Sequence, residues 1–452
     1  MSPPGRREDR PAGPRFGRRR LLSSLGAAGL VGLAGCTSLV DDGYDRNQAA
    51  FDPEIRPYDE TYPVGDELTM FRRGTRRLGY FPEASVPDAV EVEWSAPINE
   101  LGHTAAKSSP RPTPDGETLI VPDDTGRVHA FAPDGENRWT VRTGAGDSLG
   151  FHGTPTVVDG TAYVGGYDGA MYALDVETGE YVWKTTRWQL GGAIAIGSSP
   201  AYWDGVLYFV AEYNYPGMDP SGTMWALDAG TGRPLWYDDR PWGMPHPSPA
   251  IDPATERMII GSNDGVCYCW EFPSLEFAWS FETGAEIKGT IPTYEGGAFV
   301  GSWDGHFRRL DLEDGSLEWS FETGAITMSN PGIDPDAGVV YVGSDDRNVH
   351  ALDADSGERL WSRNVHGHVI GSLNVTPECV LVGSYDARLY CLEKDTGAVR
   401  WTVEGIGHAT SEAVPHDGRI FYAERADLSG YWADDEETVV EEPGRVYGLR
   451  PA

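Results

Sequence analysis

From about residue 91 onward, the chain alternates short apolar runs with turns rich in glycine and aspartate. Residues 161–183 show one unit completely. A strand at 163–164 leads through an Asp-Gly turn to a second strand at 171–174, and an Asp-x-x-Thr-Gly turn leads to a short strand ending at Trp183. An Asp-Gly pair between strand-forming runs indicates a hairpin, because glycine takes positive φ without steric cost. The pattern predicts a β-meander.

The same unit recurs along the chain. Its second strand leads into a Gly-Ser-x-Asp turn, as at 300–305, and its third into an Asp-x-x-Ser/Thr-Gly turn, as at 351–357. A Ser-Ser-Pro sequence or a variant of it, as at 108–110, precedes each innermost strand. A repeat of about 40 to 45 residues with four short strands indicates propeller blades. The fourth strands end on tryptophans that lie 40 to 53 residues apart: Trp94, Trp139, Trp183, Trp236, Trp279, Trp319, Trp361 and Trp401.

The two ends of the repeat region complement each other. Trp94 closes a strand at 91–96 that has no repeat before it, whereas the last repeat, after Trp401, has three strands and no fourth. Joining the two ends would leave no free sheet edge. We therefore predict an all-β fold, an eight-bladed β-propeller of four-stranded antiparallel blades over residues 91–452, closed by the N-terminal strand.

The repeats over residues 91–450 resemble the PQQ-like (pyrroloquinoline quinone) repeat family. This family includes quinoprotein dehydrogenases and the BamB-like lipoproteins of outer-membrane assembly, and the chain resembles the BamB-like members more than the dehydrogenases. The resemblance implies that each tryptophan of the Asp-x-x-Thr-Gly-x-x-x-Trp signature docks between adjacent blades. It also implies a protein partner in envelope assembly or maintenance.

Residues 1–35 are predicted to be a targeting segment. Three arginines at 18–20 precede an apolar run at 21–34, which is short for a membrane span and fits a twin-arginine signal peptide. The run ends in Leu-Ala-Gly-Cys, which resembles a lipobox with Cys36 as the lipid attachment site. We expect a lipid anchor on the outer face of the cytoplasmic membrane. An uncleaved anchor, the alternative, would leave the protein on the same side.

Residues 36–90 are expected to tether the propeller. Positions 37–57 are polar and acidic and predict a disordered spacer. Residues 70–80 combine aromatic side chains with four arginines. We expect this lead-in to pack on the propeller, with its arginines paired to acidic blade edges; a mobile linker is the alternative.

The composition is strongly acidic. The 452 residues include 70 acids against 36 lysines and arginines, for a net charge of −34, and lysine occurs only at Lys107, Lys184, Lys288 and Lys394. An acidic excess spread over the whole chain indicates a surface adapted to high salt, where screening removes self-repulsion. A solubility device is the alternative. No basic stripe exists to bind phosphates, so nucleic acid is excluded as a partner. We expect a monomer.

Apart from Cys36, four cysteines remain, at Cys267, Cys269, Cys379 and Cys391. We expect free, buried thiols, although a disulfide across the hairpin between Cys379 and Cys391 remains open. A metal site at Cys267 and Cys269 would need two further ligands that the sequence does not supply. No metal site is predicted.

An enzymatic function is the main alternative to a binding function. By resemblance, a PQQ-dependent dehydrogenase would need adjacent cysteines, calcium ligands and a catalytic aspartate in long loops. The chain has no adjacent cysteine pair, and only Lys288 and Trp242 are candidates for holding a quinone. Hydrolase and nucleotide motifs are absent from the sequence. We therefore predict no catalytic residues and no cofactor, with PQQ and calcium kept as the alternative.

The binding surface is predicted from the long loops. In a meander, loops between second and third strands lie on the same end as the connections between blades, and the two long ones are at 211–222 and 424–444. Their aromatic and apolar residues predict a partner-binding rim: Tyr213, Tyr215, Met218, Tyr431 and Trp432.

Basic side chains recur ahead of the inner strands on that same end. We place them at the channel mouth: His103, His152, His246, Lys288, His368 and His408. Satisfying local backbone groups is their expected role, and metal or quinone ligation is the alternative.

These observations predict a non-catalytic, lipid-anchored propeller that binds an envelope or secreted protein partner at the outer cell surface. A receptor for an extracellular solute or polymer is the second class that fits the same fold and location.

Overall fold

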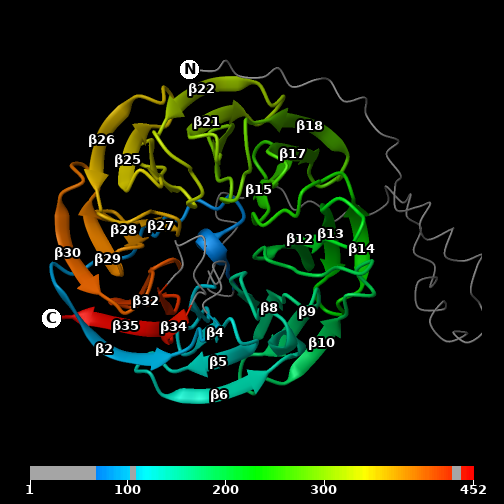
Figure 1. Ribbon diagram of the computed structural model, residues 1–452, viewed down its shortest axis with the longest axis horizontal. Coiled ribbons are helices and arrows are strands. Elements are labelled where there is room, and N and C mark those ends of the chain that lie inside the picture. Colours follow the sequence, from blue (N-terminus) through cyan, green and yellow to red (C-terminus); the bar gives the residue numbers. More distant parts are fainter. Residues whose placement is uncertain (1–67, 102–107, 430–438) are drawn as a thin grey trace, which may run out of the picture. The chain divides into compact units, whose positions relative to one another are not determined.

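The computed structural model describes residues 68–101, 108–429 and 439–452. They form a ring of eight antiparallel sheets around a central channel, with the first strand of each sheet innermost (Figure 1). The only helical turns in the described chain are η1 (Phe71–Arg73) and η2 (Gly144–Asp147), and neither approaches the length of a membrane-spanning helix.

Blades 1 to 4 follow one another along the chain, each running from the channel outward. Blade 1 is β3 (Arg111–Pro112), β4 (Leu119–Pro122), β5 (Arg127–Phe131) and β6 (Asn137–Arg142). Blade 2 is β7 (Thr156–Val158), β8 (Thr161–Gly165), β9 (Met171–Asp175) and β10 (Tyr181–Thr185). Blade 3 is β11 (Ala201–Trp203), β12 (Val206–Tyr213), β13 (Ser221–Asp228) and β14 (Pro234–Asp238). Blade 4 is β15 (Ala250–Asp252), β16 (Arg257–Gly261), β17 (Val266–Glu271) and β18 (Phe277–Glu282).

Blades 5 to 7 repeat this order, and blade 8 joins the two ends of the ring. Blade 5 is β19 (Thr293–Tyr294), β20 (Gly297–Gly301), β21 (His306–Asp311) and β22 (Leu317–Glu322). Blade 6 is β23 (Gly332–Asp334), β24 (Val339–Gly343), β25 (Asn348–Asp353) and β26 (Arg359–Asn364). Blade 7 is β27 (Leu373–Val375), β28 (Cys379–Ser384), β29 (Arg388–Glu393) and β30 (Val399–Glu404). Blade 8 is β31 (Val414–His416), β32 (Arg419–Ala423), β35 (Arg445–Pro451) and β2 (Val90–Pro97).

The ring closes through β2, as the sequence predicts. This strand pairs antiparallel with β35 from Val90 opposite Pro451 to Pro97 opposite Arg445, and so supplies the fourth strand that the last repeat lacks. The predicted eight-bladed, all-β fold with an N-terminal closing strand is therefore confirmed.

The fourth-strand tryptophans dock against the next blade. The Trp139 indole N–H donates to the Val176 carbonyl at 2.8 Å, and its ring covers Gly179. Gly179 has φ +73°, and a Cβ there would lie 2.7 Å from the ring, so the turn requires glycine on both grounds. The same indole hydrogen bond forms at Trp94, Trp183, Trp279, Trp319, Trp361 and Trp401.

Trp236 and Trp401 lack the contact with a glycine because the turns they face differ, although Trp401 keeps the indole hydrogen bond. The blade 4 turn that corresponds to the glycine turns of the other blades, residues 271–276, contains no glycine, and Trp236 instead packs edge-on against Trp270, with ring centroids 6.3 Å apart. Trp401 faces blade 8, in which no turn joins the third strand, β35, to the fourth strand, β2. Its indole donates to the Pro87 carbonyl at 2.8 Å, just before the closing strand.

The repeated polar residues before the inner strands form a hydrogen-bonded belt around the channel. At most positions a backbone N–H donates to the hydroxyl or amide oxygen at the equivalent place in the next blade. This explains the Ser-Ser-Pro signature, since each blade supplies an acceptor for its neighbour. The belt runs from Ser109 through Thr154, Ser199, Ser248 and Thr290 to Asn330, and Glu412 returns it to Ser109.

The aspartates of the turns between second and third strands are hydrogen-bonded within their own blade. Asp168 accepts from the N–H of Ala170 at 3.2 Å and from the Tyr172 hydroxyl at 2.5 Å. Asp264 does the same with Tyr268, and Asp346 with His350. The recurring carboxylates therefore cap turns, as the sequence predicts for this motif. The four cysteines of the described chain are also as predicted, free and buried.

Candidate functional site

The lead-in runs into the channel and is fastened to several inner strands. β1 (Leu68–Thr69) pairs with β7, and the carbonyls that follow accept backbone N–H groups from four further blades. The bonds are 2.8 to 3.0 Å long, from Ile251, Thr293, Ile333 and Val375. The lead-in packs on the propeller, as predicted. It packs inside the channel and not on an outer surface. Residues 68–81 are called the plug below.

For Arg72, Arg73 and Arg77 the predicted pairing with acidic blade edges is wrong. Arg72 and Arg77 are completely buried and donate to backbone carbonyls that border the channel, among them Leu373 at 2.6 Å and Pro249 at 2.8 Å. Burial lowers the pKa of Arg72 to about 10 and that of Arg77 to about 9, so both stay charged near neutral pH. Arg73 does pair with a carboxylate, but that carboxylate is Glu83 of the lead-in itself. An argument from side-chain charge alone could not predict that backbone carbonyls accept these hydrogen bonds.

A buried ion pair joins the plug to the ring closure. Glu412 of blade 8 accepts from the Arg111 guanidinium of blade 1 and from the Arg72 backbone N–H at 3.1 Å. Arg111 is 2% exposed and Glu412 is fully buried. One carboxylate thus connects the last blade, the first blade and the plug.

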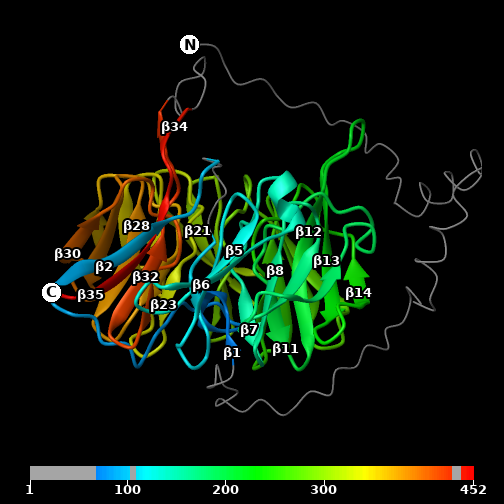
Figure 2. The same cartoon turned by 90° about the horizontal axis from the view of Figure 1, so that it is seen from below.

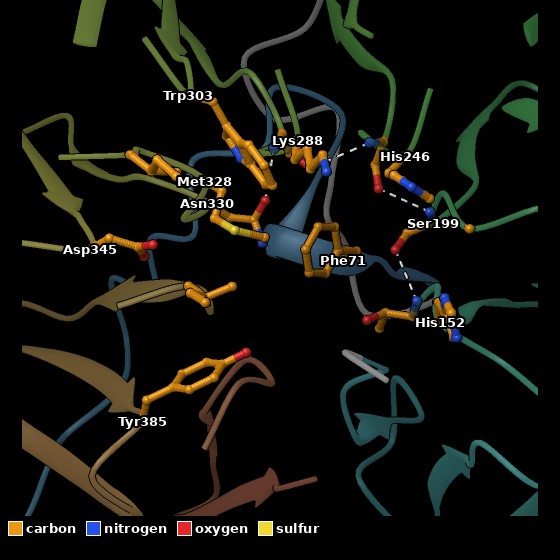
Figure 3. Close-up of a pocket in the computed structure, with 16 residues that line it drawn as sticks. Phe71, His152, Ser199, His246, Lys288, Trp303, Met328, Asn330, Asp345 and Tyr385 are labelled. Atoms are coloured by element: carbon orange, nitrogen blue, oxygen red, sulfur yellow. Dashed lines mark hydrogen bonds between the residues drawn. The ribbon is translucent and has the colours of Figure 1, made fainter. Parts of the chain in front are cut away.

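Above the plug lies a cavity of about 320 Å³, with the Phe71 ring in its floor (Figure 3). Its walls come from the connections between blades and from the turns between second and third strands. Polar and aromatic side chains from five blades face it: His152, His246, Lys288, Trp303, Asp345 and Tyr385. The cavity therefore belongs to the end of the ring that carries the blade connections.

Three of the predicted channel-mouth residues, His152, His246 and Lys288, line this cavity. His368 and His408 do not line the cavity but contact two residues that do: His368 Nδ1 lies 3.7 Å from Asp345, and the His408 ring stacks on Tyr385 with centroids 4.0 Å apart. His103 lies outside the described residues.

The histidines do not form a metal site in the described chain. His246 Nδ1 lies 3.1 Å from the buried Glu212 carboxylate, and His408 Nδ1 bonds the Tyr385 carbonyl at 3.0 Å. Burial lowers the pKa of His408 to about 4, which keeps this ring neutral. Among the described residues, no three His, Cys, Asp or Glu side chains converge as metal ligands do.

The long loops rise from the same end of the ring. Figure 2 shows the loop that joins β12 to β13 and the hairpin of β33 (Asp427–Ser429) and β34 (Val439–Glu442) above this end, which is called the hairpin end below.

The predicted rim needs correction at Tyr213. β12 continues through this residue, whose side chain is 2% exposed; its hydroxyl donates to Leu190 at 2.6 Å and accepts from Trp225 at 3.0 Å. Tyr213 is a core residue because β12 extends to residue 213, past the predicted start of the loop at residue 211. Tyr215 is half-buried and bonds the Gly192 carbonyl, whereas Met218 is exposed. Tyr431 and Trp432 lie outside the described residues.

Two exposed tryptophans were missed as surface residues. Trp188 is 72% exposed and Trp242 is 50% exposed, and they belong to the blade connections on either side of the β12–β13 hairpin. Backbone bridges fasten both connections to the hairpin, at Ala195–Glu212 and Ser221–Trp242. The longest spacing between repeats, 53 residues ending at Trp236, was the available signal for an elaborated region.

Comparison with known proteins agrees with the fold. A family model described as "Outer membrane protein assembly factor BamB" matches residues 90–238, 220–335 and 329–452, which together span the ring. BamB of Yersinia pestis is 26% identical over 277 residues, covering 56% of this chain and 66% of that protein. The serine/threonine-protein kinase AfsK of Streptomyces coelicolor is 27% identical over 250 residues, covering 54% of this chain but only 27% of the kinase.

A solved structure of a europium-containing methanol dehydrogenase superposes with a TM-score of 0.69, covering 85% of this chain and 98% of that one. At 13% identity this similarity concerns the fold alone. The repeats, the ring and the family match lead to one conclusion: the chain belongs to the PQQ-like repeat propeller family that the BamB family model describes.

Proposed function

We propose that this protein is a non-catalytic scaffold that binds an envelope or exported protein partner at the outer face of the cytoplasmic membrane. The family match and the relative named as an outer membrane protein assembly factor support a protein-binding role. Twin-arginine export and a lipid on Cys36 complete the proposal by holding the propeller at that membrane face.

The exposed indoles beside the β12–β13 hairpin carry the proposal. Trp188, Trp242 and Met218 are 72%, 50% and 42% exposed on one elaborated end of the ring. Large aromatic side chains supply much of the binding energy at protein interfaces, so two exposed indoles on one end of the ring favour docking of a partner there. Among the described residues the proposed rim is therefore Trp188, Met218, Trp242 and the half-buried Tyr215, and Tyr431 and Trp432 stay predicted members.

The described residues do not fit the calcium-bound quinone of the enzymatic alternative. They contain no cluster of three carboxylate, histidine or cysteine ligands, and the chain has no adjacent cysteine pair. Of the two residues considered for a quinone, Lys288 faces the cavity, whereas Trp242 lies on the exposed rim. The two therefore do not act together on one planar cofactor.

Affinity capture from membranes tests the proposal. The full chain, tagged at its C-terminus, is expected to recover one protein in a stoichiometric ratio, and the triple variant Trp188→Ala, Met218→Ala, Trp242→Ala is expected to lose it while melting as the parent does. A control replaces Leu317 and Leu360, which are 49% and 53% exposed on outer strands, by alanine and should retain the partner. Equal recovery by all three proteins would refute docking at this end.

A further inference from the structure

The plug contacts all eight blades from the centre of the ring, where η1 lies (Figure 1). From Thr69 to Gly79 its contacts pass from blade 1 to blade 7, and the Arg72 N–H adds blade 8. The residues that it bonds, from blade 1 to blade 8, are Pro112, Val158, Tyr202, Ile251, Thr293, Ile333, Val375 and Glu412. One short segment therefore connects every blade of the ring.

The innermost strands need these bonds because they are short edge strands. Each is two or three residues long and pairs with a single strand of its own blade. The N–H groups of Ile251, Thr293, Ile333 and Val375 donate to plug carbonyls at 2.8 to 3.0 Å. A buried N–H group without an acceptor is costly, so the plug stabilises the inner edges of the blades that it contacts.

The two buried guanidinium groups join further pairs of blades. Arg72 donates to the carbonyls of Leu373 in blade 7 and of Pro331, which leads into blade 6. Arg77 donates to two carbonyls that lead into blades 3 and 4. Bringing two charges into a finished channel would require removing their hydration before these acceptors are reached. This cost favours burial of the arginines while the blades assemble.

The backbone of the plug also depends on the blades around it. Arg72, Arg73 and Arg77 have φ of +59°, +53° and +61°, in the left-handed region that residues other than glycine seldom adopt. Such conformations persist where the surrounding structure holds them. The plug and the inner strands therefore take their shapes together.

Sequence separation favours early contacts with the plug over the outer closure of the ring. Glu91 of β2 and Arg450 of β35 are 359 positions apart, whereas Thr69 and Pro112 are 43 positions apart. Contacts between distant residues form slowly, because closing a long loop costs more entropy than closing a short one. Blades that are already held on the plug leave a much shorter loop to close when β2 meets β35.

We propose that the plug is the assembly core of the ring. The blades condense around it one after another during folding, and the outer pairing of β2 with β35 forms last. Glu412, which bonds the Arg72 N–H and the Arg111 guanidinium, joins the last blade to the plug and to blade 1. In the opposite order, β2 would close the ring first and the plug would enter a finished channel. This role concerns folding and does not depend on the proposed partner docking.

Pulsed hydrogen exchange during refolding of the full chain tests this order without any substitution. Unfolded protein is diluted into native conditions, labelled at successive times and digested. We expect the plug amides, among them those of Arg73, Gly79 and Phe81, to gain protection before the amides of the β2–β35 ladder. Protection of the plug in the same step as that ladder, or after it, would overturn the proposal.

Two arginine variants of the full chain provide a second test, by refolding and unfolding kinetics after jumps in urea concentration. Arg77→Met removes a plug guanidinium, and Arg309→Met is the matched control. Arg309 is also buried and also donates to backbone carbonyls, those of Ala354 and Glu295, but it lies on β21, away from the plug.

We expect Arg77→Met to slow refolding about 10-fold or more and to change the unfolding rate less than about 2-fold, as for a charged hydrogen-bonding group that is already buried when the ring forms. Arg309→Met should mainly speed unfolding. An effect of Arg77→Met on unfolding alone, or the same pattern in both variants, would show that the plug joins a ring that is already closed.

Discussion

The contact between a fourth-strand tryptophan and the glycine of the next blade is the smallest part of the fold that the sequence reveals. Six of the indoles lie against such glycines, and seven donate to a carbonyl of the next blade or of the segment before β2. The motif was readable because glycine, threonine and tryptophan recur at fixed spacing. The exception at Trp236 was not readable, since the departure lies in the neighbouring turn.

Replacing Gly179 by alanine tests this contact, with Gly418→Ala as the matched control. Both glycines have φ +73°, so each substitution costs about 1 kcal/mol for the backbone. Only Gly179 has a ring 2.7 Å from the added Cβ, whereas Gly418 has nothing within 4 Å. We expect Gly179→Ala to lower the free energy of unfolding by about 1–3 kcal/mol more than Gly418→Ala, because the indole must move. Equal losses in urea titrations would show that docking contributes nothing.

Glu424 predicts a pH dependence at the seam of blade 8. Its carboxyl is buried and accepts from the Tyr447 hydroxyl at 2.7 Å and the Ile406 N–H at 3.1 Å. Burial raises the pKa of Glu424 from 4.5 to about 7. The folded protein therefore holds this proton where the unfolded chain has lost it. The resulting stabilisation is complete below pH 4.5 and disappears as the pH rises to 7.

The variant Glu424→Gln lacks this titration. Relative to it, the native protein should lose about 3 kcal/mol of unfolding free energy between pH 4.5 and pH 7. Denaturant titrations of both proteins at each pH measure the difference. Two parallel stability profiles would contradict the raised pKa.

Among the elements, the plug and the β12–β13 hairpin have features that the sequence did not predict. Arginines and aromatic residues indicated that the lead-in packs on the ring. The channel position was not predictable, because it depends on carbonyls that only the assembled ring brings together. The hairpin was recognised as long, but β12 extends through Tyr213, and all of its residues are buried. Trp188 and Trp242 belong to connections without any repeat pattern.

Stepwise truncation tests the plug as a structural element. Removing residues 1–67 should leave the melting temperature unchanged, whereas removing 1–81 should lower it strongly, since loss of the buried Phe71 ring alone is worth about 3–5 kcal/mol. A synthetic peptide of residues 68–81 should restore part of the loss. Identical melting of the two truncated proteins would show that the inner strands do not need the plug.

At the scale of the whole molecule, the ring was predictable because eight similar units leave little choice of architecture. One strand precedes the first complete repeat and three strands follow the last one, which predicted how the ring closes. The pairing of β2 with β35 confirms this closure. The surface charge affects this whole assembly. Adaptation of its −34 charge to high salt remains a prediction.

Lowering the salt concentration tests the adaptation. The screening length grows from about 3 Å at 1 M to about 30 Å at 0.01 M, so repulsion among carboxylates extends across several blades. We expect the melting temperature to fall continuously over this range. A melting temperature independent of salt would leave the acidic surface as a solubility device.

Site-specific photo-crosslinking in intact cells tests the central claim, partner docking at the hairpin end, most directly. A photoreactive phenylalanine analogue replaces Trp242 on the rim or, as the control, Leu360 on β26, two positions of similar exposure. The account predicts one discrete adduct with an envelope or exported protein from position 242 and none from position 360. No adduct from position 242, or the same adduct from both positions, would contradict it.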